Sequence, residues 1–216
     1  MPGVYNRKDH LYRKAKDEGY RSRAAYKLEE IDKKYRLLKK GYRVVDLGCA
    51  PGGWLQVAAK KVGSDGMVLG VDLERVSPFR AGELANEACQ PRLLVGDMNS
   101  AEVQAMLLSL AAGPVDVVLS DMSPKLSGIR ERDQVQSVAL CESALTVCGS
   151  ILRPGGSFVA KIFPSEEAED FAKRLGEAFR KSFRVHAKSS RKTSTELYLV
   201  GLGFRPAASE GKEDVS

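Results

Sequence analysis

The chain has 216 residues, 43% of them hydrophobic, which is enough for one domain with a full core. No run approaches the roughly 18 consecutive apolar residues of a membrane span, and the first ten residues lack the apolar segment of a secretory signal. The four cysteines form no C-x-x-C pair and only two histidines are present, which argues against a metal site. We therefore expect a cytoplasmic, monomeric protein without a metal or membrane segment, whose cysteines are reduced and buried.

The net charge of +6 is concentrated in two stretches. Residues 1–43 contain 14 Lys and Arg against 6 Asp and Glu, and residues 180–192 contain six Lys and Arg and no acid. Two basic stretches on a nearly neutral body favour a polyanionic partner, most simply a nucleic acid. Solvated surface charge is the alternative interpretation.

The N-terminal stretch combines this positive charge with a helical pattern. Residues 1–20 predict an extended or partly helical arm, and Ser22 can cap the helix that follows. The apolar stripe of this helix comprises Ala24, Leu28, Ile31, Tyr35 and Leu38. Lys27 lies about 40° from Ile31 around the helix, so it lies against the body either as a functional group or as a lysine with a buried stem. We expect residues 1–40 to form a basic extension with a nucleic-acid-binding helix, 41–204 one domain, and 205–216 a disordered tail.

From residue 42 onward, short apolar runs that end in a charged residue alternate with helix-length segments. The runs are Val44–Asp46, Met67–Asp72, Arg92–Asp97, Val115–Asp121 and Gly156–Lys161, and the helical segments are 53–62, 100–112, 133–152 and 165–181. This alternation predicts a parallel sheet with helices on both faces. Ligands bind at the carboxyl ends of such strands, so the charged residues mark the rim of a site.

The last apolar run reverses this order. Glu196 precedes residues 197–202, and it reaches the same rim only if its strand is antiparallel to the others. We predict a strand near 182–187, a basic turn over 188–195 and an antiparallel strand over 196–202. The turn would bring Ser190, Arg191 and Lys192 near the site.

A glycine-rich turn, Asp46-Leu-Gly-Cys-Ala-Pro-Gly-Gly-Trp54, joins the first strand to its helix. Gly48, Gly52 and Gly53 permit a sharp turn and close approach to a ligand, and the N–H groups of the next helix face that ligand. The spacing is not the G-x-G-x-x-G of dinucleotide sites, and the carboxylate of Asp46 suits a ligand with a positive charge. A tight turn without a ligand is the alternative.

The neighbouring strand ends complete a pocket of the adenosine type. Asp72 stands where α/β nucleotide sites place a carboxylate on ribose hydroxyls, and Asp97 can accept from an exocyclic amine. Trp54 packs either on the ligand or in the core. Acids without a phosphate-binding lysine favour S-adenosylmethionine over ATP or NAD, because its sulfonium is cationic and it carries no phosphate.

Four charged residues remain: Lys27, Asp121, Lys161 and Glu196. The predicted topology brings these two bases and two acids together. A hydroxyl that attacks a methyl group must lose its proton, and a lysine accepts it only if a nearby cation or burial lowers the pKa of that lysine. Alternatively, the lysines position a ribose and phosphate, and orientation supplies most of the rate.

Five segments resemble the FtsJ/RrmJ family of S-adenosylmethionine-dependent RNA ribose 2′-O-methyltransferases. They are Ser22–Leu28, Asp46–Trp54, Ser120–Pro124, Gly155–Lys161 and Ser190–Tyr198. The resemblance implies a Rossmann-like methyltransferase domain with a mostly parallel seven-stranded sheet whose last strand is antiparallel. It assigns the family's K-D-K-E tetrad to Lys27, Asp121, Lys161 and Glu196, with Lys161 as the principal base. It also implies cofactor contacts from Gly52, Trp54, Asp72, Asp97 and Asp121.

The compact length resembles the bacterial branch, whose substrate is a uridine in the A loop of 23S ribosomal RNA. We therefore expect ribosomal RNA, within the large ribosomal subunit, as the partner. Other branches modify tRNA or the mRNA cap, so a tRNA 2′-O-methyltransferase is an alternative. A methyltransferase for a small molecule or a base is another, as is a non-catalytic ribosome-assembly factor.

Overall fold

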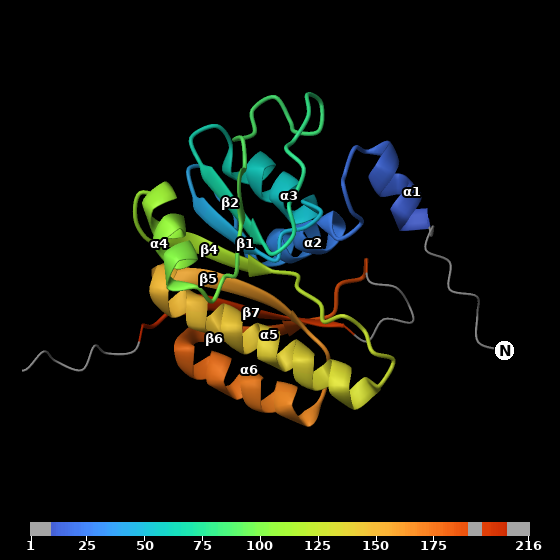
Figure 1. Ribbon diagram of the computed structural model, residues 1–216, viewed down its shortest axis with the longest axis vertical. Helices are drawn as coiled ribbons and strands as arrows, with labels where there is room; N and C mark the ends of the chain where they lie inside the picture. The colour runs from blue at the N-terminus through green and yellow to red at the C-terminus, as the bar shows by residue number, and fades with distance from the viewer. Residues whose placement is uncertain (1–9, 190–195, 207–216) are drawn as a thin grey trace, which may run out of the picture.

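The computed structural model describes residues 10–189 and 196–206, which contain six helices and seven strands (Figure 1). The helices are α1 (His10–Asp17), α2 (Ala25–Tyr35), α3 (Gly53–Val62), α4 (Ala101–Leu110), α5 (Arg130–Ile151) and α6 (Glu166–Ala178). The strands are β1 (Arg43–Leu47), β2 (Met67–Asp72), β3 (Arg92–Val95), β4 (Val115–Ser120), β5 (Leu152–Ile162), β6 (Phe179–Val185) and β7 (Leu197–Phe204).

The strands form one sheet in the order β3-β2-β1-β4-β5-β7-β6. Strands β3, β2, β1, β4 and β5 pair in parallel, and β7 runs antiparallel to both β5 and β6. The predicted mostly parallel seven-stranded sheet with an antiparallel last strand is therefore confirmed. The chain builds outward in opposite directions from β1 and β4, and the crevice at such a switch point is where ligands bind in this class of fold.

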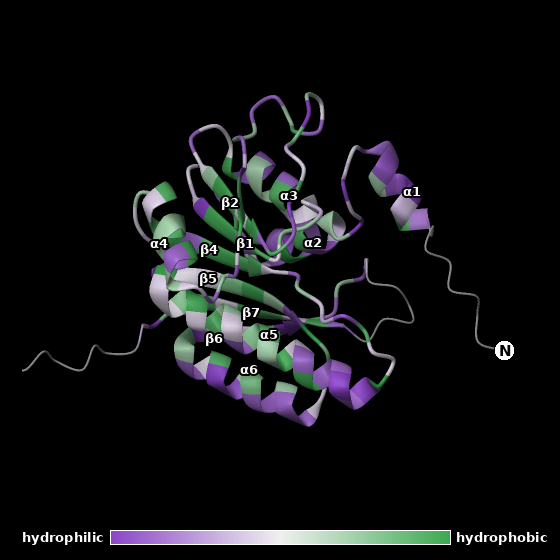
Figure 2. Cartoon of the chain, viewed as in Figure 1, coloured by the Kyte–Doolittle hydropathy of each residue, from purple (hydrophilic) through white to green (hydrophobic). Residues whose placement is uncertain are grey.

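Helices cover both faces of the sheet, as predicted. Leu107 of α4, Val138 of α5 and Phe171 of α6 pack in the core on one face. Leu28 of α2 and Leu55 of α3 pack in the core on the other. The strands between these two layers are strongly hydrophobic, whereas α1 and α6 turn hydrophilic residues outward (Figure 2). Burial on both faces explains why the strands read as continuous apolar runs in the sequence.

The predicted helix over 165–181 was wrong at its end, and the strand predicted near 182–187 begins earlier. The helix ends at Ala178, and β6 starts at Phe179. The Phe179 ring is fully buried, with its centroid 6.1 Å from that of Phe158 and 5.2 Å from that of Phe204. Burial among these aromatic rings of the sheet outweighs the helical spacing that residues 179–181 share with α6.

The prediction for the helix after Ser22 was also wrong at both ends. Helix α2 starts at Ala25 without a side-chain cap, and it ends at Tyr35 because Arg36 is left-handed, with a φ of 53°. Leu38 lies beyond the helix but is still buried. Because α2 packs on α3, it belongs to the folded body, and the division of the chain at residue 40 stays a prediction. The predicted basic turn and the tail fall mostly outside the described residues.

Candidate active site

The glycine-rich turn packs closely against two other segments at the carboxyl edge of the sheet. A Cβ atom at Gly48 would lie 2.2 Å from Cγ of Met122, and one at Gly53 would lie 2.3 Å from Oγ of Ser22. Gly52 has a φ of 111°, a conformation that strains residues with a side chain. The turn therefore brings its backbone against the segments that follow β4 and precede α2.

Asp46 is buried at this edge without a partner. Its side chain is 1% exposed, and no donor in the described part of the chain bonds to either carboxylate oxygen. Burial, together with the nearby charges of Asp121 and Asp72, raises the pKa of Asp46 well above its ordinary value. An unpartnered buried carboxylate is costly. It borders a cavity of about 140 Å³, where a cationic or hydrogen-bond-donating ligand would supply the missing partner.

The other predicted cofactor residues are brought together only in part. Asp46, Gly48, Gly53, Trp54 and Asp121 line this cavity. Gly52, Asp72 and Asp97 do not belong to its lining. Asp72 accepts from the backbone N–H groups of Ala50 and Glu74, each at 2.9 Å, and thereby holds the turn. Asp97 is exposed beyond β3 and accepts from the backbone and side chain of Asn99.

Trp54 is a core residue, and its contact with a ligand stays a prediction. It is almost fully buried, its indole N–H donates to the carbonyl of Ala24 at 2.8 Å, and its ring centroid lies 5.8 Å from that of Tyr198. It also lines the cavity beside Asp46. Trp54 is thus a core residue that contributes one wall of the site.

The four residues of the predicted tetrad form two ion pairs. Nζ of Lys161, on β5, donates to the main-chain oxygen of Asp121 at 2.6 Å and lies 3.2 Å from its Oδ1. Lys27, on α2, forms an ion pair with Glu196, which directly precedes β7. Both lysines are buried, with exposures of 7% and 8%. The antiparallel β7 therefore brings Glu196 to the edge where β4 and β5 end.

Tyr198 links the two ion pairs and was not identified from the sequence. Its hydroxyl donates to Oδ1 of Asp121 at 2.8 Å, and Nζ of Lys27 lies 5.7 Å from its ring centroid. Burial, followed by the charges of Asp121 and Glu196, raises the pKa of Tyr198 well above its ordinary value. The signal was present, because residues two apart on a strand face the same side and Tyr198 follows Glu196 by two.

Two further expectations concern cysteines and metals. All four cysteines are free and buried, as predicted. The thiol of Cys141 donates to the carbonyl of Lys161 at 3.0 Å, and burial raises its pKa to about 12. Over residues 10–189 and 196–206, no three His, Cys, Asp or Glu residues gather as metal ligands do.

None of the helices described is both long and apolar enough to cross a bilayer.

Residues 20–204 match the family described as FtsJ-like methyltransferase. The chain belongs to this family. The ribosomal RNA large subunit methyltransferase E of Methanobrevibacter smithii is 43% identical over 95% of both chains. The protein of the same name from Myxococcus xanthus is also 43% identical, over 97% of this chain and 96% of its own length. The crystal structure of a ribosomal RNA methyltransferase from Plasmodium falciparum is 25% identical, with a TM-score of 0.73 over 87% of this chain and all of that one.

Proposed function

We propose that this protein transfers a methyl group from S-adenosylmethionine to a ribose 2′-hydroxyl of ribosomal RNA. The target we assign is a uridine in the A loop of 23S RNA. The observation that carries the proposal is an unpartnered buried carboxylate, Asp46, beside two lysine–carboxylate ion pairs at one edge of the sheet. The names of the relatives from M. smithii and M. xanthus support large-subunit ribosomal RNA as the substrate class.

The residues around the turn fit S-adenosylmethionine. Asp46 offers two unpaired oxygens to a cationic group. Gly48 and Gly53 line the same cavity as Asp46 and have no side chain to fill it. We assign Asp72 to the ribose hydroxyls and Asp97 to the exocyclic amine. Gly52, Trp54 and Asp121 complete the assigned contacts. When bound, this cofactor supplies a methyl group activated by a sulfonium.

Lys161 is the group that we assign to accept the proton of the ribose hydroxyl. Its Nζ is held as a donor by Asp121, so it must first release a proton to the surroundings before it can act as a base. The Tyr198 hydroxyl donates to the same oxygen of Asp121, Oδ1, that Lys161 contacts. Lys27 and Glu196 then orient the ribose. If both lysines only position the RNA, a cation at position 161 that cannot accept a proton should preserve activity.

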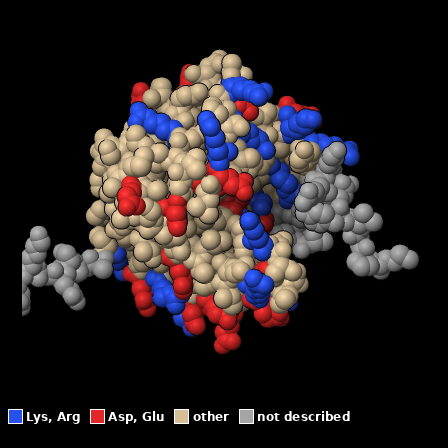
Figure 3. All heavy atoms as spheres, in the orientation of Figure 1, with Lys and Arg blue, Asp and Glu red and all other residues tan. Residues whose placement is uncertain are grey.

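The distribution of charge supports an RNA partner. Lys and Arg side chains are frequent on the upper and right parts of the face in Figure 3, and Asp and Glu side chains along its lower edge, where α6 lies. A protein that neutralises phosphates loses affinity steeply as salt rises. Methyl transfer at subsaturating RNA should therefore fall with increasing salt, whereas a small-molecule methyltransferase should be insensitive.

The test follows labelled methyl from S-adenosylmethionine into intact large ribosomal subunits, naked 23S RNA and bulk tRNA. We expect label in large-subunit RNA, in a 2′-O-methyluridine that resists alkaline cleavage, and no label with Lys161→Ala. Label in tRNA would overturn the substrate, and label on a base would overturn the reaction. Absence of label with tight RNA binding would instead favour an assembly factor. Comparison of subunits with naked RNA identifies the form that the protein recognises.

A further inference from the structure

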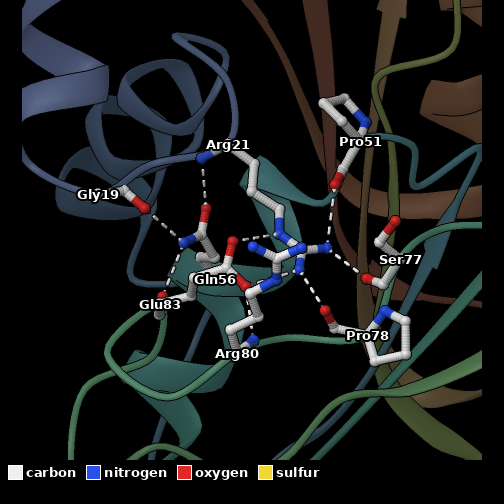
Figure 4. A network of polar contacts seen from close by, with 8 residues as sticks. All are labelled: Gly19, Arg21, Pro51, Gln56, Ser77, Pro78, Arg80 and Glu83. Carbon is white, nitrogen blue, oxygen red and sulfur yellow. Dashed lines mark hydrogen bonds and ion pairs between the residues drawn. The ribbon is translucent and has the colours of Figure 1, made fainter.

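Arg21 lies outside the tetrad but joins three segments around the cofactor turn (Figure 4). Its Nη1 donates to the carbonyls of Ser77 at 2.6 Å and Pro51 at 3.4 Å. Its Nη2 donates to the carbonyl of Pro78 at 2.7 Å and to Oε2 of Glu83 at 2.8 Å, and Nε donates to Oε1 of Glu83 at 3.2 Å. The Arg21 side chain is only 11% exposed. A two-pronged contact with a carboxylate is strong and directional.

The backbone of Arg21 is held by the side chain of Gln56. Its N–H donates to Oε1 of Gln56 at 2.8 Å, and Nε2 of Gln56 donates to the carbonyls of Gly19 at 2.9 Å and Glu83 at 2.7 Å. Gln56 belongs to α3 and is buried. The side chains of Arg21 and Gln56 therefore connect three segments: the residues before α2, the start of α3 and residues 77–83. We call this set of contacts the Arg21 joint.

The glycine-rich turn packs directly on this joint. A Cβ atom at Gly52 would lie 3.0 Å from Cζ of Phe79 and 3.2 Å from Cδ of Arg21. The guanidinium carbon of Arg21 lies 3.7 Å from the centroid of the Phe79 ring, within the range of a cation–π contact. Arg21 and Phe79 thus form the wall against which the turn is shaped.

The joint borders two cavities at this edge of the sheet. Arg21, Ser77, Pro78 and Glu83 line a cavity of about 440 Å³, which shares Ala50 and Pro51 with the smaller cavity at Asp46. Ser22, the next residue along the chain, lines the smaller cavity. The same segment continues into α2, which carries Lys27. A displacement of Arg21 would therefore change the cofactor turn and the lysine helix together.

We propose that Arg21 is a positioning residue that sets the cofactor turn against the segment leading to Lys27, so that affinity for S-adenosylmethionine depends on its guanidinium. The inference rests on the proposed cofactor but not on the proposed RNA target. Without the planar fork, the carbonyls of Pro51, Ser77 and Pro78 lose their common donor, and the turn is no longer held in its binding conformation.

The test compares Arg21→Lys with Arg153→Lys. Arg153 is a control arginine at the far end of β5, 40% exposed against 11% for Arg21, and its guanidinium contacts Asp116 at 2.7 Å, the carbonyl of Pro154 at 3.1 Å and the Tyr42 ring at 5.9 Å. Lysine keeps the charge but loses the fork in both variants. Isothermal titration calorimetry gives the Kd for S-adenosylmethionine without RNA, and thermal unfolding gives the Tm. We expect Arg21→Lys to raise the Kd about tenfold and Arg153→Lys to change it less than about twofold.

The two measurements separate positioning from general stability. A purely structural role would lower the Tm of both variants and leave both Kd values close to that of the wild type, which would overturn the inference. If Arg21→Lys does not fold, Glu83→Gln removes the paired carboxylate instead. We expect that variant to weaken binding about threefold, and an unchanged Kd would refute the role of the joint. A wild-type protein that fails to bind the cofactor would refute the proposed function, not the inference alone.

Discussion

The Lys61–Asp32 and Lys161–Asp121 ion pairs have almost the same length but opposite burial. Their N–O distances are 3.1 Å and 3.2 Å. In the first pair the carboxylate is buried and the lysine open, with side-chain exposures of 5% and 41%. In the second pair the lysine is the buried partner, at 9% against 19% for Asp121. The first pair lies between α2 and α3, and the second lies at the carboxyl edge of the sheet.

The remaining contacts of these groups account for the difference. Asp32 also accepts from the backbone N–H of Leu38 at 2.9 Å, so it fastens the chain that leaves α2. Asp121 lines the cavity beside Asp46, whose carboxylate has no hydrogen-bond partner in the part of the chain that the structure describes. The buried carboxylate of Asp32 is satisfied within the fold, whereas that of Asp46 at the sheet edge has no donor among the described residues. This contrast predicts opposite consequences for similar substitutions.

The largest effect is expected when each lysine is replaced by arginine. Lys161→Arg keeps a cation beside Asp121 but cannot accept a proton, so kcat for methyl transfer should fall by about 100-fold to 10,000-fold. Lys61→Arg should leave kcat unchanged, because an arginine can still pair with Asp32 at that exposed position. Single-turnover methylation of ribosomal RNA measures both rates. Substantial activity in Lys161→Arg would mean that Lys161 positions the ribose and is not the base.

The next largest effects, on stability and on cofactor affinity, are expected from Asp46→Asn, with Asp32→Asn as its control. At neutral pH a buried carboxyl without a partner must either stay protonated or bury its charge, and asparagine at position 46 avoids that cost, so the ligand-free protein should gain about 1–3 kcal/mol of stability. It should also bind S-adenosylmethionine about 10-fold to 100-fold more weakly, because a charge-assisted contact is lost.

The control substitution at Asp32 should lower the stability of the protein and leave its affinity for the cofactor unchanged. Asp32→Asn should lose up to about 1 kcal/mol, since its ion pair is partly exposed, and should leave the Kd for the cofactor unchanged. Urea unfolding and calorimetry report the two quantities. Loss of stability in Asp46→Asn would show that the folded protein supplies its carboxylate with a partner.

The raised pKa of Asp46 should also make the stability of the ligand-free protein depend on pH. Because burial raises this pKa in the folded state, the folded protein keeps a proton that the unfolded chain has released above about pH 4. Its contribution to stability is complete below that pH and declines as pH rises toward the folded-state pKa. This group changes the free energy of unfolding by at most about −1.4 kcal/mol per pH unit. Urea unfolding of the ligand-free proteins at several pH values measures this dependence. The free energy of unfolding should fall more steeply with rising pH in the wild type than in Asp46→Asn.

The backbone topology was accessible from the sequence because charged residues lie at or just after the carboxyl ends of the parallel strands. Asp46, Asp72, Asp121 and Lys161 marked the carboxyl ends of parallel strands, and the reversed position of Glu196 predicted the antiparallel β7. The boundary at Phe179 was missed because its burial depends on Phe158 and Phe204, which are distant in the sequence. Periodicity reports local structure, and it carries no information about such partners.

The site was predicted unevenly for the same reason. The closeness of Lys161 and Asp121 follows from strand order, because they lie at the carboxyl ends of neighbouring strands, whereas the position of Lys27 depends on how helix α2 packs. The Arg21 joint depends on main-chain carbonyls of Ser77 and Pro78, which have no signature in the side chains of the sequence. The proposed role of Asp97 in the cofactor pocket stays a prediction. Contacts between a side chain and a distant backbone become visible only once the loops are folded.

The smallest effect is expected from Tyr198→Phe, compared with Tyr20→Phe. Each tyrosine hydroxyl donates to a carboxylate, to Asp121 at 2.8 Å for Tyr198 and to Glu29 at 2.6 Å for Tyr20. Removal of one such bond should cost each protein about 1 kcal/mol of stability. Only Tyr198→Phe frees the carboxylate that holds Lys161, so its kcat should fall about fivefold to tenfold while the Kd for the cofactor stays constant. Equal kcat values for the two variants would mean that Lys161 holds Asp121 in place without help, and that the link between the two ion pairs stabilises the protein only.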